Sequence, residues 1–309
     1  MMCIKERNAS DSTCKKLLRD KGCFADLCNY AFFQGRQVIQ PEELVSREND
    51  LSTLIGKIDK PTEIKRYRDV VRKASIHGEY VIIGVEHQST FDEKMIFRIL
   101  NYDATIYINQ VESKQEVYPV GSFVFYTGDK EWKSPETLKE TLKNIPPEME
   151  PYINDWRLPV VELKTMDARK LTNQRLKEVV EISQSMFAGN YDDLRNNRKI
   201  EIENFMMAAT FTRTKIKRED LPEGDEINMC EAMDRLFQRF ENQGMEKGKI
   251  IGFEKGKSDT LKEQLKVKLG TLSRPLEKQL TNTSLEKLNE LTLNIFNVTN
   301  EEDVLRIIN

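Results

Sequence analysis

Residues 67–89 read YRDVVRKASIHGEYVIIGVEHQS, and this stretch decides the fold. Two runs rich in β-branched and aromatic residues lie on either side of the dipeptide His77-Gly78, which predicts two antiparallel strands joined by a two-residue turn. Counting outward from this turn along both strands brings Asp69 opposite Glu86. The stretch therefore predicts a β-hairpin with two carboxylates on one face.

The predicted pair of Asp69 and Glu86 places like charges side by side, with Cβ atoms about 5 Å apart. Because this arrangement destabilises a sheet, the pair requires a shared proton or a divalent cation. Mg²⁺ suits such a pair, since it takes oxygen ligands and commonly binds through one or two carboxylates and several waters. The alternative is a surface hairpin whose carboxylates are solvated and bind no metal. A longer loop or a bulge would separate the two side chains.

Alternation along the second strand places further side chains. Gln88 projects on the same face as Glu86, whereas His87 projects on the other face. We therefore expect His87 to be a packed histidine rather than a ligand. The predicted working unit consists of Asp69, Glu86 and Gln88.

The segment before the hairpin predicts a helix. Phe24, Leu27, Cys28 and Ala31 have the spacing of one helical face, which is typical of an amphipathic helix with one buried side.

The segment after the hairpin continues the α/β pattern. Thr90 and Glu93 match a capping box before a periodic apolar run, which predicts a helix of about five turns. Two strand-like runs follow, at 119–126 and 157–163, with a short helix at about 135–143 between them. We expect a mixed α/β domain.

From Leu171 onward the periodicity is helical, so we expect an all-α C-terminal region. Glycine recurs every fourth residue from Gly244 to Gly256, and each glycine weakens a helix by about 1 kcal/mol unless a neighbour packs closely on the stripe. We interpret this stretch as a semi-flexible connector. The predicted divisions are an α/β domain at 15–165, a helical extension at 166–243, the connector at 244–257 and a helical module at 258–309.

Composition narrows the class of protein. The 309 residues carry 48 Lys and Arg against 51 Asp and Glu, so contact with DNA has to be local rather than through a strongly basic surface. The five cysteines lack the paired spacing of a zinc site and only two histidines occur, so metal chemistry has to use carboxylates. No apolar run has the length of a membrane span or of a secretory leader, and we expect a cytoplasmic protein that contacts no membrane.

Stretches from nearly the whole chain match the pattern of one family. They are FADLCNY at 24–30, QVIQPEEL at 37–44, YRDV at 67–70, EHQS at 86–89, VGSFVFYTG at 120–128 and NMCEAM at 228–233. Met95, Arg98, Tyr102, Trp132 and the glycine-punctuated connector add to the match. On these residues the chain resembles the Rpn family of recombination-promoting nucleases and putative transposases, within the PD-(D/E)XK nuclease superfamily.

The resemblance implies an αβββαβ-type core, a mixed sheet flanked by helices, and hydrolysis of DNA with Mg²⁺ or Mn²⁺. The roles of the two metal-binding acids fall on Asp69 and Glu86, and Gln88 would orient the attacking water. Arg68 replaces the proline and Gln88 the lysine of the superfamily pattern. Because a neutral amide adds no positive charge near the phosphorus, we expect a slow or strongly metal-dependent endonuclease.

The resemblance also implies supporting residues. A carboxylate from the first helix commonly completes such sites, with Asp26 as the first choice for a further metal ligand and Glu43 as the second. Arg98 and Tyr102, one helical turn apart, would bind a phosphate or hold the metal ligands. The alternative for each acid is an ordinary exposed carboxylate, and for Arg98 and Tyr102 a pair on the helix surface.

Two rival hypotheses belong to other classes of protein. One is a nuclease fold that binds DNA or a protein partner without cutting, which the acidic net charge and Gln88 favour. The other is a helical scaffold that forms a homo-oligomer through its C-terminal helices, which the glycine stripe and a heptad-like seam motivate. That seam consists of Met229, Met233, Leu236 and Phe240.

Overall fold

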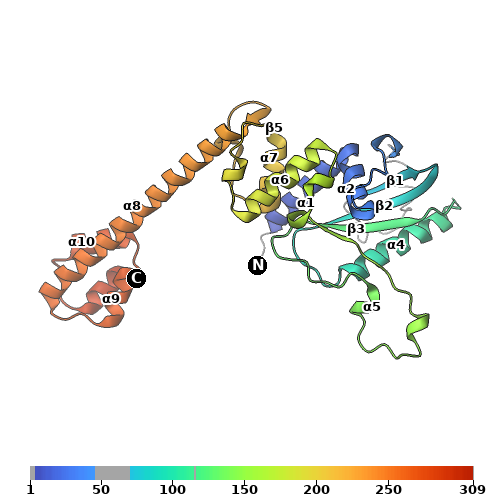
Figure 1. Ribbon diagram of the computed structural model, residues 1–309. Helices are drawn as coiled ribbons and strands as arrows, with labels where there is room; N and C mark the ends of the chain where they lie inside the picture. Colours follow the sequence, from blue (N-terminus) through green and yellow to red (C-terminus); the bar gives the residue numbers. More distant parts are fainter. Residues whose placement is uncertain (1–3, 46–69, 115, 309) are drawn as a thin grey trace. The chain divides into compact units, whose positions relative to one another are not determined.

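The computed structural model describes residues 4–45, 70–114 and 116–308. The chain divides into two compact units, Met1–Met233 and Asp234–Asn309. The first unit contains a four-stranded mixed sheet with the strand order β1-β2-β3-β4 (Figure 1). Its strands are β1 (Val70–Ile76), β2 (Glu79–Gln88), β3 (Val120–Tyr126) and β4 (Val160–Glu162).

β1 and β2 form the predicted hairpin. His77 and Gly78 both have positive φ, at 54° and 89°, as the central residues of a type I′ turn do. The antiparallel register runs outward from this turn to Val70 opposite Val85. The predicted turn and its register are confirmed over these pairs.

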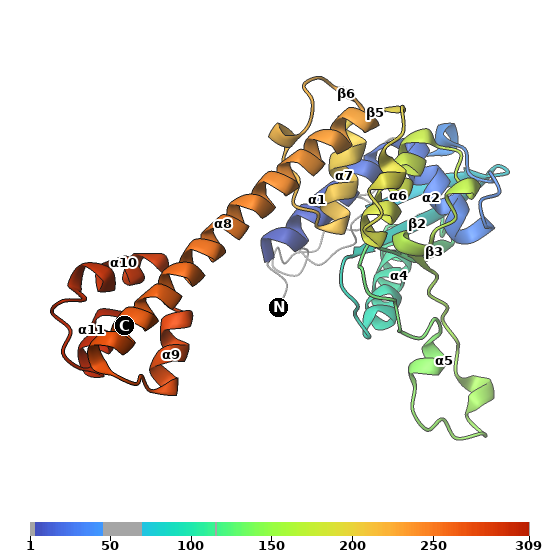
Figure 2. The ribbon, with the colours of Figure 1, turned by 60° about the vertical axis from the view of Figure 1, so that its left-hand side comes forward.

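The remaining strands of the sheet are parallel. β2 pairs with β3 and β3 with β4, and parallel neighbours require a crossover connection. Helix α4 (Met95–Glu112) supplies the first crossover and has the predicted five turns. The second connection extends away from the sheet (Figure 2) and carries the short helix α5 (Leu138–Thr141), which Thr137 caps.

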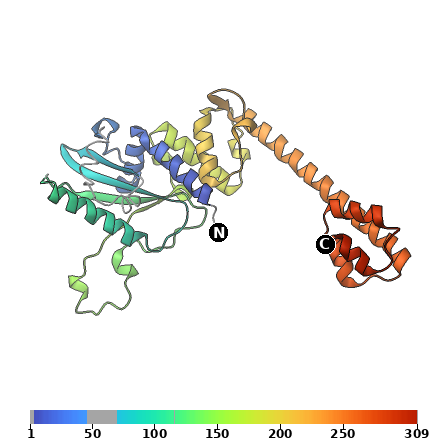
Figure 3. The same cartoon turned by 180° about the vertical axis from the view of Figure 1, so that it is seen from behind.

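Alternate strand residues pack against different helices on the two faces of the sheet. On one face Val124 and Tyr126 pack against α4. On the other face Val85, Phe123 and Phe125 pack against α2 (Lys21–Phe33) and α6 (Gln174–Ala188). Figure 3 shows α4 on one side of the sheet and α1 (Ile4–Arg19), α2 and α6 on the other.

The predicted amphipathic character of α2 is wrong. Residues 23–29 are all buried, including the polar Asp26 and Asn29. Asn29 accepts hydrogen bonds from the backbone N–H groups of Val38 and Ile39, so a loop covers the side that was expected to face solvent.

The predicted capping box at Thr90 and Glu93 is also wrong. α4 begins at Met95, and Lys94 at its N-terminus makes no side-chain cap bond. Asp92 instead accepts the backbone N–H of Lys94, 3.0 Å away, so the helix starts one turn later than the sequence pattern indicated.

The rest of the first unit is mainly helical. α7 (Ile202–Thr212) packs against α6 and α1. The all-α prediction fails at β5 (Lys199–Glu201) and β6 (Glu226–Asn228), which pair as a small antiparallel sheet. Each of these strands has three residues, too short for a periodic pattern to reveal.

Helix α8 (Met229–Leu269) is a single helix of 41 residues that includes all four regularly spaced glycines. In the described structure, no atom beyond the helix's own neighbouring backbone lies within 4 Å of a Cβ atom added at any of these glycines, Gly244, Gly248, Gly252 and Gly256. The stretch predicted as a connector is therefore helical, although no described neighbour packs on its glycines.

The described residues of the second unit form helices joined by short turns. α9 (Arg274–Thr281), α10 (Leu285–Asn294) and α11 (Glu301–Ile308) pack with the last turns of α8. Their shared core contains Leu261, Leu265, Leu276, Leu280, Leu288, Leu291, Val298, Val304 and Ile308. None of the helices in the described ranges has both the length and the hydropathy needed to cross a membrane.

Candidate functional site

Glu86 and Gln88 lie together on the face of β2 that meets α4. Glu86 is only 4% exposed, and its Oε1 accepts a hydrogen bond from Gln88 Nε2 at 3.3 Å. Gln88 lies two positions after Glu86 on the same strand, so its side chain projects on the same face and reaches the carboxylate, as alternation predicts. This arrangement places a carboxylate and a carboxamide at the carboxyl end of β2.

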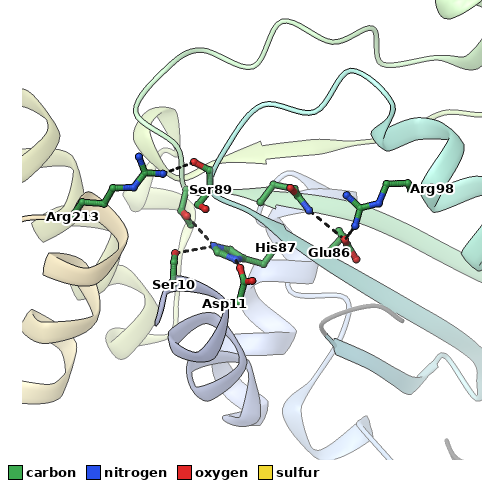
Figure 4. Close-up of polar contacts among 9 residues, drawn as sticks. Ser10, Asp11, Glu86, His87, Ser89, Arg98 and Arg213 are labelled. Carbon is green, nitrogen blue, oxygen red and sulfur yellow. Dashed lines mark hydrogen bonds and ion pairs between the residues drawn. The ribbon is translucent and has the colours of Figure 1, made fainter. Parts of the chain in front are cut away.

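Arg98 contacts Glu86 directly from the first turns of α4 (Figure 4). Its Nη2 donates to Glu86 Oε1 at 2.7 Å and its Nη1 to Asp92 Oδ2 at 3.0 Å. Burial opposes the charge of the guanidinium, but its hydrogen bonds with Tyr102 and Asp92 and the charge of Glu86 outweigh this effect and raise the pKa of Arg98. The side chain of Arg98 is 36% exposed, so one part of this cation is open to solvent.

Asp69 lies outside the described residues. Its pairing with Glu86 stays a prediction, although the observed register from Val70 outward to the turn is the one on which the prediction was based. Within the described residues, no group of three or more His, Cys, Asp or Glu side chains gathers as a metal site. Burial also raises the pKa of the thiols of Cys23 and Cys28, so neither supplies a thiolate ligand at neutral pH.

The structure gives Asp26 a different role from the metal ligand implied by the resemblance. Its Oδ2 accepts the backbone N–H groups of Thr172 and Asn173, at 2.8 and 2.9 Å. Its Oδ1 accepts hydrogen bonds from the Thr172 hydroxyl and from Gln37. Asp26 belongs to α2, on the sheet face opposite to α4, so we do not retain it with Glu86.

Glu43 is likewise engaged elsewhere. It ends a short 3-10 turn, Pro41–Glu43, and its carboxylate accepts the backbone N–H of Gln40 at 3.2 Å. The following Leu44 forms an antiparallel bridge with Ala74 of β1. The structure thus places Glu43 near the edge strand β1, where its carboxylate binds the backbone of its own turn.

His87 points away from Glu86, as alternation predicts, and is fully buried among polar partners. Its Nδ1 lies 2.8 Å from Asp11 Oδ1 in α1, and its Nε2 lies 2.9 Å from the Thr127 hydroxyl. Asp11 and Thr127 are not among the residues that the sequence patterns predicted for the site. No local pattern could have found them, because they lie 76 and 40 residues from His87 along the chain.

Arg213 is a third residue near the site that no sequence pattern indicated. It caps the C-terminus of α7 and donates from Nη2 to the backbone carbonyl of Ser89 at 2.8 Å (Figure 4). This bond attaches the segment directly after Gln88 to the helical part of the first unit.

Part of the chain matches a known protein family. Residues 62–212 match the family described as "Putative transposase, YhgA-like", which confirms the family resemblance for this part of the chain. Neither the search of curated proteins nor the search of solved structures finds a match.

Proposed function

We propose that the protein is a metal-dependent DNA endonuclease whose site is formed by Glu86, Gln88 and Asp69. The observation that carries the proposal is the buried carboxylate of Glu86, held beside Gln88 and Arg98 at the end of an interior strand. Buried ionised groups are costly and concentrate at functional sites. The match to the transposase family covers all four residues and favours a DNA substrate.

The order of elements supports a PD-(D/E)XK-type core. If the bridge of Leu44 with β1 is taken as a short edge strand, the described elements follow the order α2, edge strand, β1, β2, α4 and β3. This is the αβββαβ order that the resemblance implies. In such a core the acids of the hairpin and the helix after it share one face, which is where Glu86 meets Arg98.

The donors available suit Mg²⁺ or Mn²⁺. Glu86 provides carboxylate oxygens, Gln88 an amide oxygen, and Asp69 a second carboxylate in the extrapolated register. When bound, the metal would supply a water of lowered pKa and positive charge for the phosphate. Hard oxygen ligands are the kind that these two cations select.

The protein's own groups divide the remaining work. The Gln88 carboxamide, which can both donate and accept, orients the attacking water. The partly exposed guanidinium of Arg98 binds a phosphate oxygen while Asp92 keeps it in place. Because Gln88 carries no charge, this cation takes over part of the role of the lysine in the superfamily pattern.

A second candidate function is binding of DNA or of a protein partner without cleavage. The observation that favours it is the ion pair of Glu86 with Arg98, which neutralises the carboxylate without a metal. A DNA-binding protein of this kind loses affinity steeply as salt rises, because phosphate contacts release counterions. A DNA affinity that does not change with salt would contradict DNA binding through this site.

The first experiment is cleavage of supercoiled plasmid with Mg²⁺, Mn²⁺ or EDTA. Asp69→Ala and Glu86→Ala are compared with wild type after circular dichroism confirms that each protein is folded. Glu79→Ala is the matched control, since Glu79 lies on the same strand but is exposed beside the turn. We expect metal-dependent nicking by wild type and the control, and loss of at least about 100-fold in both site variants.

The outcomes separate the two candidate functions. Full nicking by Asp69→Ala would contradict the two-carboxylate assignment. A folded wild type that cuts with none of the metals would favour the binding function, and Gln88→Lys would then test whether the missing cation explains the lack of activity.

A further inference from the structure

The buried imidazole of His87 lies directly behind the proposed site. Glu86 and Gln88 project from one face of β2, and His87, between them in sequence, projects from the other. Its side chain is 0% exposed and packs beside the rings of Phe125 and Phe211, with centroids 6.4 and 5.9 Å away. Movement of this ring would therefore move the backbone that carries both site residues.

Asp11 determines where the imidazole proton lies. A carboxylate can only accept, so the hydrogen in the 2.8 Å contact with His87 belongs to Nδ1. In the neutral ring Nε2 then accepts the hydroxyl hydrogen of Thr127 at 2.9 Å, and Ser10 lies further away at 3.4 Å. Figure 4 shows Asp11 and Ser10 reaching His87 from α1, on the side away from Glu86.

Thr127 connects the side chain of His87 to the backbone of Gln88. Its N–H donates to the carbonyl of Gln88 at 2.8 Å, while its hydroxyl contacts His87. Thr127 is 1% exposed and follows the last residue of β3. One buried threonine thus binds two consecutive residues at the end of β2.

These contacts of Asp11, His87 and Thr127, which we call the clamp, lie at the end of strand β2. Gln88 is the last residue of β2, and its pairing with Tyr126 is the last of the β2–β3 ladder. Strand ends open more readily than strand centres, whereas a catalytic group has to be held within about 0.5 Å of its working position. Hydrogen bonds from the opposite face are one means of meeting that requirement.

We propose that Asp11, His87 and Thr127 are positioning residues that fix Glu86 and Gln88 from the opposite face of the sheet. The inference rests on the proposed function, and it assigns helix α1 to the site although α1 contributes no atom that touches substrate. Removing the Thr127 hydroxyl removes the partner of Nε2, and replacing the Asp11 carboxylate by a neutral carboxamide weakens the hydrogen bond from Nδ1. Either change loosens the end of β2.

The test compares two substitutions of one residue. Thr127→Val keeps the shape but removes the hydroxyl, whereas Thr127→Ser keeps the hydroxyl but removes a methyl group. We expect Thr127→Val and Asp11→Asn to lower the plasmid nicking rate by about tenfold or more, with the Kd for DNA changed less than about twofold. Thr127→Ser should nick near the wild-type rate. Thr105→Val, which loses a threonine hydrogen bond on the surface of α4, is the control.

Amide hydrogen exchange gives a second readout that does not depend on cleavage. It is measured on two peptides, one that contains residues 86–89 and one that contains Thr127. We expect exchange to be faster in Thr127→Val than in wild type and unchanged in Thr127→Ser. If wild type does not nick DNA, the endonuclease proposal fails, and this exchange pattern still tests the clamp.

Two results would overturn the inference. One is equal nicking and equal exchange for wild type and Thr127→Val. The other is a Thr127→Ser variant as impaired as Thr127→Val, because the methyl group rather than the hydroxyl would then matter.

Discussion

At the scale of single residues, the environment of Glu86 is the informative feature. An ionised side chain that is 4% exposed requires partners, because burial without them costs several kcal/mol. Arg98 and Gln88 supply these partners at the same oxygen, Oε1. Both partners donate to this oxygen, as a carboxylate ligand of a metal also requires of its surroundings.

Arg98→Gln should destabilise the protein by about 1–3 kcal/mol, because it leaves a buried carboxylate without its cation. If the proposed metal site is correct, Mg²⁺ should recover part of this loss, since a bound cation replaces the missing charge. Urea unfolding with and without Mg²⁺ measures both effects.

The control for this prediction is Arg169→Gln. Arg169 also pairs with an aspartate, Asp167, but its side chain is 90% exposed, and solvent screening leaves exposed pairs with little effect on stability. A stability loss in Arg98→Gln no larger than in Arg169→Gln would contradict the role assigned to the Arg98 pair.

The site residues show what strand periodicity can predict. Alternation correctly placed Gln88 beside Glu86 and His87 on the other face, because these positions depend only on the pleat of one strand. Asp26 lies apart from Glu86 because its helix packs on the opposite face of the sheet. There its carboxylate accepts hydrogen bonds from the backbone of Thr172 and Asn173. Strand periodicity does not determine which face a separate helix covers.

At the scale of elements, α8 departs most from expectation. Its glycines lower helix propensity by about 1 kcal/mol each, yet the helix continues through them. An isolated helix with alanine at these four positions would be more stable. The regularly spaced glycines instead leave one side of α8 without side chains, and another helix can approach such a side closely. This feature motivates the proposal of a homo-oligomer.

Gly244→Ala combined with Gly248→Ala should stabilise α8 by about 1 kcal/mol per site, since each new Cβ has open space around it in the described structure. Circular dichroism at increasing urea concentration measures the change. Gly35→Ala should have the opposite effect, because Gly35 has φ of 90° and its Cβ would lie 2.8 Å from Lys170.

If the double variant is less stable than wild type, or no longer forms an oligomer that wild type forms, the space around these glycines is not open. That result would indicate that another helix packs on them. Light scattering of the full chain, beside a chain truncated before Gly244, would then show whether the C-terminal helices drive assembly.

At the scale of the whole molecule, ion pairs between helices join the parts of the first unit. Glu203 of α7 pairs with Lys16 of α1 and with Arg175 of α6. The hydrogen bond from Lys16, together with the charges of both cations, lowers the pKa of Glu203 against the effect of burial. These contacts hold α1, which supplies Asp11, against the helical layer.

The lowered pKa makes a signed prediction about acid stability. A carboxyl group whose pKa is lower in the folded than in the unfolded state stabilises the fold at neutral pH. This contribution is lost as the pH falls below the ordinary value of 4.5 and through the lowered folded value. Glu203→Gln should therefore lose less stability than wild type between about pH 6 and pH 3.

Thermal unfolding across this pH range tests the prediction, with Glu263→Gln as the control at an exposed position of α8. Equal pH dependence in wild type and Glu203→Gln would contradict the assigned role of Glu203 in joining the three helices.

The sequence by itself determined the features that depend on neighbours along the chain. These are the turn at His77 and Gly78, the register of the hairpin, the face shared by Glu86 and Gln88, and the alternation of helices and strands. A two-residue turn allows one register, and the pleat of a strand repeats every two residues, so both follow from local geometry.

Only the tertiary structure decided which distant groups meet. Asp11 reaches His87 across 76 residues, and Asp26 reaches Asn173 across 147 residues. Such pairs depend on which helix covers which face of the sheet, and that choice is made by the packing of the whole core rather than by any local pattern. The predicted ligand therefore became a structural carboxylate, and the histidine set aside as packing became the centre of the clamp behind the proposed site.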